Sequence, residues 1–346
     1  MNIKDILQQG VENKDFPGGQ FCYIKDDQIL CDTVGFKQLE PIKIPNTGNE
    51  IYDVASLSKV LSTTILAHKL LEDGIWTLET KLSDVLNRFE HASITIKDLL
   101  IHSSGLKADI VRANKLSSKK ALIDKLYAER PYYEKGSMIV YSDVGYLLLG
   151  LAIEQTLEMP LDEAAYQHIF LPLGMEDTSY HPDQTRTAPT EFRFDEVHQG
   201  LLNGMVHDEK SYAMKGIAGH AGLFSTAKDI SIFIQAILDD RFVLKRETVL
   251  KMFHVEIEEN DQFGNPKARS LGYEKPSKDH ILYPYQDEII MHTGFTGCHM
   301  MINLKRNTGF VLLTNAVHPK RELNHIFSYR NQIYQEITKE WEKKNA

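Results

Sequence analysis

The sequence lacks an apolar run long enough to cross a bilayer. The longest apolar stretches, around residues 145–153 and 309–317, fall well short of the roughly 20 residues that a spanning helix needs. The first residues also lack the apolar core and cleavage site of a secretory leader, and instead predict a short amphipathic helix with Ile3, Ile6, Leu7 and Val11 on one side. We therefore expect no membrane association and a cytoplasmic protein, or an extracytoplasmic one if a leader was removed.

Basic residues are also fewer than acidic ones. Lys and Arg number 39 against 48 Asp and Glu, which gives a net charge of −9, and no long basic run is present. Because proteins that grip phosphate backbones depend on clustered Lys and Arg, nucleic acid is not an expected partner. The composition, 42% hydrophobic and 25% charged, is that of an ordinary globular protein, and 346 residues predict about two domains or one large fold with an insertion.

Cysteine is scarce. Three are present, Cys22, Cys31 and Cys298, and none forms a Cys-x-x-Cys pair. If Asp26-Asp27 is a two-residue hairpin turn, Cys22 and Cys31 face each other across the strand pair. A disulfide is conceivable there, but in a reducing compartment we expect two buried free thiols.

Several catalytic signatures are missing: Gly-x-Ser-x-Gly, the Walker phosphate loop, His-Glu-x-x-His and Gly-x-Gly-x-x-Gly. Their absence removes the usual sequence evidence for α/β-hydrolases, P-loop NTPases, zincins and dinucleotide enzymes. His207, Asp208 and Glu209 with His220 could hold zinc, but no tight ligand pair accompanies them. We expect a hydrogen-bonded loop at the rim of a cleft, with no metal and no cofactor.

The order of predicted elements indicates one sheet built from both chain ends. Strand-like runs at 20–25 and 28–34 return late at 288–291, 299–304 and 309–314. Between them lie mostly helical patterns, at 56–71, 96–101, 119–127, 142–156, 161–169 and 227–238, and a long helix at 321–342 closes the chain. We expect an α/β sandwich domain from 1–75 and 239–346, a mainly helical domain from 76–238, and an active site between them. Residues 256–285 receive no assignment.

A Ser-x-x-Lys stands at the start of the helix predicted for 56–71. Residues three apart share a helix face, so the Lys59 amine can lie beside the Ser56 hydroxyl and act as its base. The helix N-terminus also favours developing negative charge. The pattern occurs four times, and the pairs that begin at Ser104, Ser117 and Ser225 are expected to be chance surface pairs.

Two further motifs carry possible chemistry. Tyr141-Ser142-Asp143 precedes an apolar helix, where a phenol held by a lysine can shuttle protons, although a helix cap with a packed aromatic explains it as well. The segment 292–297 reads His-Thr-Gly-Phe-Thr-Gly at the end of a strand. Its glycines let a ligand approach backbone N–H groups, although a plain glycine turn would also fit.

Together, these three motifs resemble the serine β-lactamase and penicillin-binding protein superfamily, which is known for Ser-x-x-Lys with Lys-Thr-Gly. The similarity is to its class C-like branch, which includes D,D-peptidases and family VIII carboxylesterases. The segments 95–106, 172–178 and 219–229 resemble further motifs of that branch, so the similarity spans roughly residues 18–315. The resemblance implies a β-lactamase-like fold, with an antiparallel sheet flanked by helices and a helical insertion domain.

The resemblance also implies roles. Ser56 corresponds to the acylated nucleophile, Lys59 to its general base and Tyr141 to the proton shuttle. The N–H groups of Ser56 and Phe295 correspond to the oxyanion hole, and the predicted substrate-binding residues are Asp143, His292, Thr293 and Gly294. For His292 and Thr293 the resemblance also allows a contact with the Tyr141 hydroxyl instead of the substrate.

Two departures bear on the substrate. Asp143 stands where many members have Asn, and His292 where β-lactamases usually have Lys, so the fixed positive charge that would hold a penicillin carboxylate is reduced. We therefore expect a serine hydrolase of small neutral esters or amides, of the carboxylesterase type. A D,D-peptidase, penicillin-binding protein or weak β-lactamase is the alternative, and a non-catalytic ligand-binding or sensor relative is an alternative of another class. The oligomeric state is not predicted.

Overall fold

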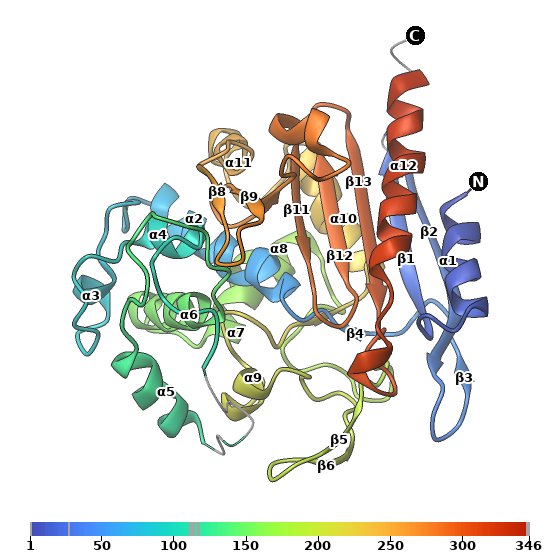
Figure 1. Ribbon diagram of the computed structural model, residues 1–346, viewed down its shortest axis with the longest axis horizontal. Coiled ribbons are helices and arrows are strands. Elements are labelled where there is room, and N and C mark those ends of the chain that lie inside the picture. The colour runs from blue at the N-terminus through green and yellow to red at the C-terminus, as the bar shows by residue number, and fades with distance from the viewer. Residues whose placement is uncertain (1, 27, 111–114, 116–117, 344–346) are drawn as a thin grey trace.

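A computed structural model describes residues 2–26, 28–110, 115 and 118–343. Its main feature is a sheet of nine strands in the order β3-β2-β1-β13-β12-β11-β10-β9-β8, with every neighbouring pair antiparallel. The strands are β1 (Gly18–Lys25), β2 (Gln28–Gln38), β3 (Ile44–Pro45), β8 (Ile257–Asn260), β9 (Pro266–Arg269), β10 (Glu274–Lys275), β11 (Ile289–Thr293), β12 (His299–Asn303) and β13 (Thr308–Thr314). The predicted antiparallel sheet from both chain ends is confirmed, with β1 paired to β13 (Figure 1).

Helices cover both faces of this sheet. Alternate side chains of a strand point to opposite faces, so Phe310 and Leu312 of β13 pack with the terminal helices α1 (Ile3–Glu12) and α12 (Phe327–Lys343). Val311 and Leu313 pack on the other side, in the core that includes α10 (Ala227–Leu238) (Figure 1). The predicted helix at each chain end is therefore confirmed as a cover for the sheet.

The remaining helices lie mostly on one side of the sheet, around the apolar helix α6 (Asp143–Leu157) (Figure 1). Its side chains are apolar on nearly every face, which is the pattern of a helix that is buried on most sides. The others are η1 (Lys59–Thr63), α2 (Thr64–Glu72), α3 (Leu82–Val85), α4 (Ile96–Leu100), α5 (Lys119–Ala128), α7 (Leu161–Ala165), η3 (Tyr166–Phe170), α8 (Leu171–Leu173), α9 (Glu209–Ala213), α11 (Arg246–Met252), η4 (Tyr283–Glu288) and η5 (Arg321–Leu323). No helix in the described part of the chain is long and apolar enough to span a membrane.

The structure adds to the expected organisation in three places. The unassigned stretch at 256–285 supplies β8, β9 and β10, which extend the sheet at one edge. The mainly helical stretch also contains short strands, β5 (Phe192–Phe194) with β6 (Gln199–Leu201), and β7 (Phe224–Ser225), which pairs with β4 (Tyr52–Asp53). Helix α10, at the end of that stretch, packs on the sheet, and the division at residues 75 and 238 stays a prediction.

The expectation of two free thiols is wrong: Cys22 and Cys31 form a disulfide. The predicted register is confirmed, because the two residues are direct partners across β1 and β2 with their Cα atoms 4.1 Å apart. That is the close spacing of a non-hydrogen-bonded antiparallel pair, which places the two sulfur atoms within bonding reach. Asp27 of the predicted turn lies outside the described residues, and Cys298 is a buried free thiol.

Candidate active site

Ser56 stands immediately after a backbone turn between β4 and the π-helical turn η1. Ala55 has φ +47°, a left-handed conformation that is unusual for a residue with a side chain. The Asp53 carboxylate holds this turn, since it accepts the N–H of Ala55 at 2.8 Å and the N–H of His207 at 2.7 Å. Local strain held by surrounding contacts is a common property of functional sites.

Lys59 lies within hydrogen-bond distance of Ser56, as the spacing predicts. Its side chain is fully buried and donates to Ser56 Oγ at 3.0 Å and to the carbonyl of His220 at 3.0 Å. The third contact of Nζ is Asp143 Oδ1, at 2.8 Å. Burial alone would lower the pKa of Lys59, but the charge of Asp143 and the Tyr141 phenol outweigh it, and the pKa is raised above its ordinary value. In this state Lys59 is an ammonium that donates to the nucleophile.

Tyr141 and Asp143 approach Lys59 from the start of α6. Ser142 caps this helix by accepting the N–H of Gly145 at 3.0 Å, so the predicted capping residue is present beside the functional ones. The Tyr141 ring centre lies 4.9 Å from Lys59 Nζ and 4.7 Å from the centre of the His102 ring. The structure therefore brings Ser56, Lys59, Tyr141 and Asp143 together.

The segment after β11 completes the site from the other end of the chain. A Cβ atom on Gly294 would lie 2.5 Å from the carbonyl oxygen of Val54, so only glycine lets this strand end approach the nucleophile segment. Gly294 therefore lets two backbone segments of the protein approach each other closely. Thr296 Oγ1 adds a hydrogen bond to the carbonyl of Asp53 at 2.7 Å.

The predicted oxyanion donors fit this geometry. Within the described residues, the backbone N–H groups of Ser56 and Phe295 donate to no acceptor. Both residues line the same cleft. Two free N–H groups beside a nucleophile are what a developing oxyanion requires.

His292 does not reach the cleft. It is 2% exposed, its ring packs 5.9 Å from that of Tyr141, and Nδ1 lies 2.9 Å from the carbonyl of Thr293. Burial, followed by the charges of Arg269 and Lys59, holds its pKa well below the ordinary value, so the ring is neutral. Thr293 and Gly294 line the cleft, whereas His292 packs against the Tyr141 ring.

The cleft has a volume of about 470 Å³ and exposes several charged side chains that the motifs did not identify. No sequence signal separates them from ordinary surface charges, because they come from loops and from α9 and α12. Its lining residues are Ala55, Ser56, Asp109, Tyr141, Asp143, His207, Asp208, Glu209, Lys210, Ala221, Thr293, Gly294, Phe295, Arg321, Asn324 and Arg330.

The loop that carries His207, Asp208 and Glu209 lies at this cleft, as predicted. His220 Nε2 is 2.7 Å from Asp208 Oδ1, and His220, Asp208 and Asp143 could bring three ligand atoms within 4.8 Å of one another. Two ammonium groups already contact these carboxylates, Lys59 on Asp143 and Lys210 on both. Because a cation there would face two like charges, the arrangement does not favour a metal ion.

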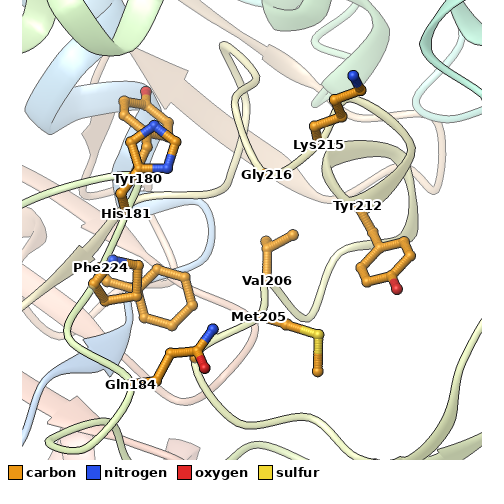
Figure 2. Close-up of a pocket in the computed structure, with 11 residues that line it drawn as sticks. Tyr180, His181, Gln184, Met205, Val206, Tyr212, Lys215, Gly216 and Phe224 are labelled. Carbon is orange, nitrogen blue, oxygen red and sulfur yellow. The ribbon is translucent and has the colours of Figure 1, made fainter.

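A second pocket lies on the other side of the same loop. It has a volume of about 260 Å³, and Val206, Tyr212 and Phe224 contribute apolar surface while Lys215 and Gln184 stand at its edge (Figure 2). None of the residues that line it belongs to the cluster around Ser56. The candidate site is therefore the cleft that Ser56 lines.

Comparison with known proteins agrees with the geometry. The family model described as Beta-lactamase matches residues 3–334. A "Putative D-alanyl-D-alanine carboxypeptidase" of Escherichia coli (strain K12) is 30% identical, with 88% of this chain and 79% of that protein covered. An "N-acetylmuramyl-L-alanine amidase" of Bacillus subtilis (strain 168) is 29% identical, with 88% and 78% covered. A solved structure described as "A class C beta-lactamase" superposes with a TM-score of 0.75 at 19% identity, covering 96% of this chain and 93% of the other, which shows a shared fold.

Proposed function

The chain belongs to the beta-lactamase family and is a serine hydrolase of that superfamily, and we propose that it cleaves small amides bearing a free carboxylate, through an acyl-enzyme on Ser56. The observation that carries the proposal is the contact of Ser56 Oγ with Lys59 beside Tyr141 and two free N–H groups. The β-lactamase-like fold places these groups at the end of the sheet, where β11 meets the nucleophile segment.

The geometry supports a two-step acyl transfer. Ser56 Oγ attacks the carbonyl carbon while its proton passes to the Lys59–Tyr141 pair, and the N–H groups of Ser56 and Phe295 receive the oxyanion. The pair returns the proton to the leaving amine as the scissile bond breaks. Water then repeats the sequence on the ester of Ser56, releasing the acid and restoring the hydroxyl. Because these groups are coupled, the proton belongs to the pair rather than to either residue.

Arg330 supports a substrate with a carboxylate. Its guanidinium lines the cleft, contacts the Phe327 ring at 5.9 Å and forms no ion pair with any described residue. Burial lowers its pKa, and the neighbouring Tyr334, Cys298 and Glu274 offset this only in part. The positive charge that His292 does not provide is thus available on α12. The names of the relatives, a carboxypeptidase and an amidase, favour the same class of substrate.

Carboxylesterase activity, the expectation from the sequence, is the second candidate. The Phe295 side chain is 57% exposed at the cleft and offers an apolar surface for a neutral acyl or alcohol group. The same nucleophile and oxyanion donors would serve an ester, whose leaving group needs less help from an acid.

The test compares wild type, Ser56→Ala and Ser225→Ala. Ser225 belongs to another Ser-x-x-Lys, and the expectation of surface pairs is wrong for the serines at 104 and 225, because both are buried. Since Ser225 does not line the cleft, it is the control serine. The substrates are a peptide ending in D-alanyl-D-alanine, an N-acetylmuramyl peptide, penicillin and p-nitrophenyl butyrate. We expect turnover of a carboxylate-bearing amide that Ser56→Ala abolishes and Ser225→Ala retains. Turnover of the butyrate ester alone would favour the second candidate, and equal activity of wild type and Ser56→Ala would disprove the nucleophile.

A further inference from the structure

Along the wall of the cleft, buried and half-buried side chains of opposite charge alternate in a row whose central residue, Lys210, no motif identified. Asp143 Oδ1 contacts Lys59 at 2.8 Å, and its Oδ2 lies 3.3 Å from Lys210 Nζ. Lys210 also lies 3.0 Å from Asp208 Oδ2, and Asp208 Oδ1 accepts from the His220 ring at 2.7 Å. The row Lys59–Asp143–Lys210–Asp208–His220 thus begins at the nucleophile's partner.

Lys210 is the centre of this row. Its side chain is 4% exposed, and its ammonium also lies 3.0 Å from Asp109 Oδ1, so three carboxylates surround it. Burial would lower the pKa of Lys210, but Asp208, Asp143 and Asp109 outweigh it and raise the pKa. An ammonium held by several carboxylates at such burial is fixed in position and in charge.

The local fold accounts for the position of Lys210. Asp208 caps α9 by accepting the N–H of Ser211 at 2.8 Å, and Asp143 stands in the first turn of α6. Carboxylates are favoured at both helix starts by the helix dipole. Because Lys210 contacts the carboxylates at both helix starts, its positive charge relieves their repulsion.

We propose that Lys210 is a positioning residue of the reaction, which divides Asp143 between two ammonium groups and so keeps Lys59 directed at Ser56. The proposal rests on the acyl-transfer function above. It also explains why an aspartate is tolerated at position 143, because the ammonium of Lys210 balances the charge of its carboxylate. Without Lys210, both oxygens of Asp143 would be free to turn to Lys59 and hold its proton more tightly.

The sign of the pH effect follows from charge. The Lys59–Tyr141 pair must lose a proton to accept the one from Ser56, and a nearby positive charge makes that loss easier. Removing Lys210 therefore raises the apparent pKa of the pair, and the acid limb of the pH profile moves to higher pH. The charged and titratable groups around this row and around the Lys59–Tyr141 pair, from every element that borders them, are Lys59, His102, Asp109, Tyr141, Asp143, Tyr146, Asp208, Glu209, His220, Arg269 and His292.

The experiment measures the rate at which a fluorophosphonate probe labels Ser56, by intact-protein mass spectrometry, from pH 5 to 10. We expect Lys210→Met to move the acid limb upward by about one unit, so labelling at pH 7 slows about tenfold while the high-pH plateau is kept. Lys210→Arg should restore most of the rate. Lys215→Met, just after the end of α9 and outside both the row and the cleft, is the control for loss of a nearby lysine and should leave the profile unchanged.

A double variant separates positioning from folding. Asp143→Asn removes the carboxylate that Lys59 and Lys210 share. The double variant Asp143→Asn with Lys210→Met should therefore shift the acid limb of the pH profile by less than the sum of the two single shifts. Additive shifts, or a lowered plateau with an unmoved limb, would overturn the role of Lys210. If wild type is not labelled at any pH, the proposed function fails first and this inference with it. Thermal unfolding of each variant shows that it is folded.

Discussion

Gly294 is the contact point between the two ends of the chain at the active site, and its replacement by alanine should affect catalysis more than folding. The new Cβ would lie 2.5 Å from the carbonyl oxygen of Val54, whereas ordinary contact begins at 3.4 Å. The obstacle is backbone, so the strand end and the nucleophile segment must separate by most of an ångström. Such overpacking costs about 1–3 kcal/mol of stability.

The catalytic effect is larger because Ser56 lies two residues from Val54, and Phe295 directly follows Gly294. Separation of these segments moves both N–H groups of the oxyanion hole away from their common target. A displacement of about 1 Å at a reacting centre can cost about 100-fold in rate. We expect Gly294→Ala to lower kcat/KM by about that factor, measured on whichever substrate wild type turns over.

The control is Gly309→Ala in β13. Its Cβ would lie 2.3 Å from the Ile234 side chain, so it also overpacks the core, but outside the cleft. Urea unfolding should show both variants destabilised, and only Gly294→Ala should lose activity. If the two variants lose activity equally, or Gly294→Ala keeps full activity, the close approach of the two backbones does not set the oxyanion geometry.

Three further variants test separate parts of the structure. Arg330→Gln should lower kcat/KM for a carboxylate-bearing amide at least tenfold through KM, while hydrolysis of p-nitrophenyl butyrate stays within twofold; equal losses would refute the carboxylate role. Cys31→Ser should lower the free energy of unfolding by about 2–3 kcal/mol, because the bond closes a short loop, and reduced wild type should match it in a urea titration. Burial lowers the pKa of Lys275 to about 8, so the unfolded chain binds more protons between pH 8 and 10.5 and stability rises with pH there. Lys275→Met should remove that rise in urea titrations across this range, and an unchanged slope would contradict the shift.

The sheet and its covering helices could be predicted because each depends on a local pattern. The alternation in β13 and the spacing of apolar residues in α10 are readable over a few residues, and α10 begins and ends where expected. The region 256–285 could not be placed, because β8 and β10 are short and polar and exist only through pairing with neighbours. The disulfide was missed for another reason: register predicts that two cysteines face each other but not whether they are oxidised.

The candidate site likewise contains residues that the sequence predicted and residues that it could not predict. Ser56, Lys59 and Tyr141 stand in motifs with fixed spacing, and the structure places them in one cluster. The motif at 292–294 predicted that His292 contacts the substrate or the Tyr141 hydroxyl; its ring is buried against Tyr141, and a contact with substrate stays a prediction. Lys210 and Arg330 had no signal at all, since their roles arise from the meeting of helix starts and loops that are far apart in sequence.

Asp53 shows why the site and the fold are difficult to separate. One of its carboxylate oxygens accepts from Ala55 and the other from His207, while its carbonyl accepts from Thr296. Three segments, each more than 80 residues from the next, thus meet at a single residue that is 2% exposed. Burial raises the pKa of Asp53, so its two backbone donors must offset the cost of its charge. The turn at Ser56 is therefore held in place by contacts from two distant segments, and the position of the nucleophile depends on tertiary structure.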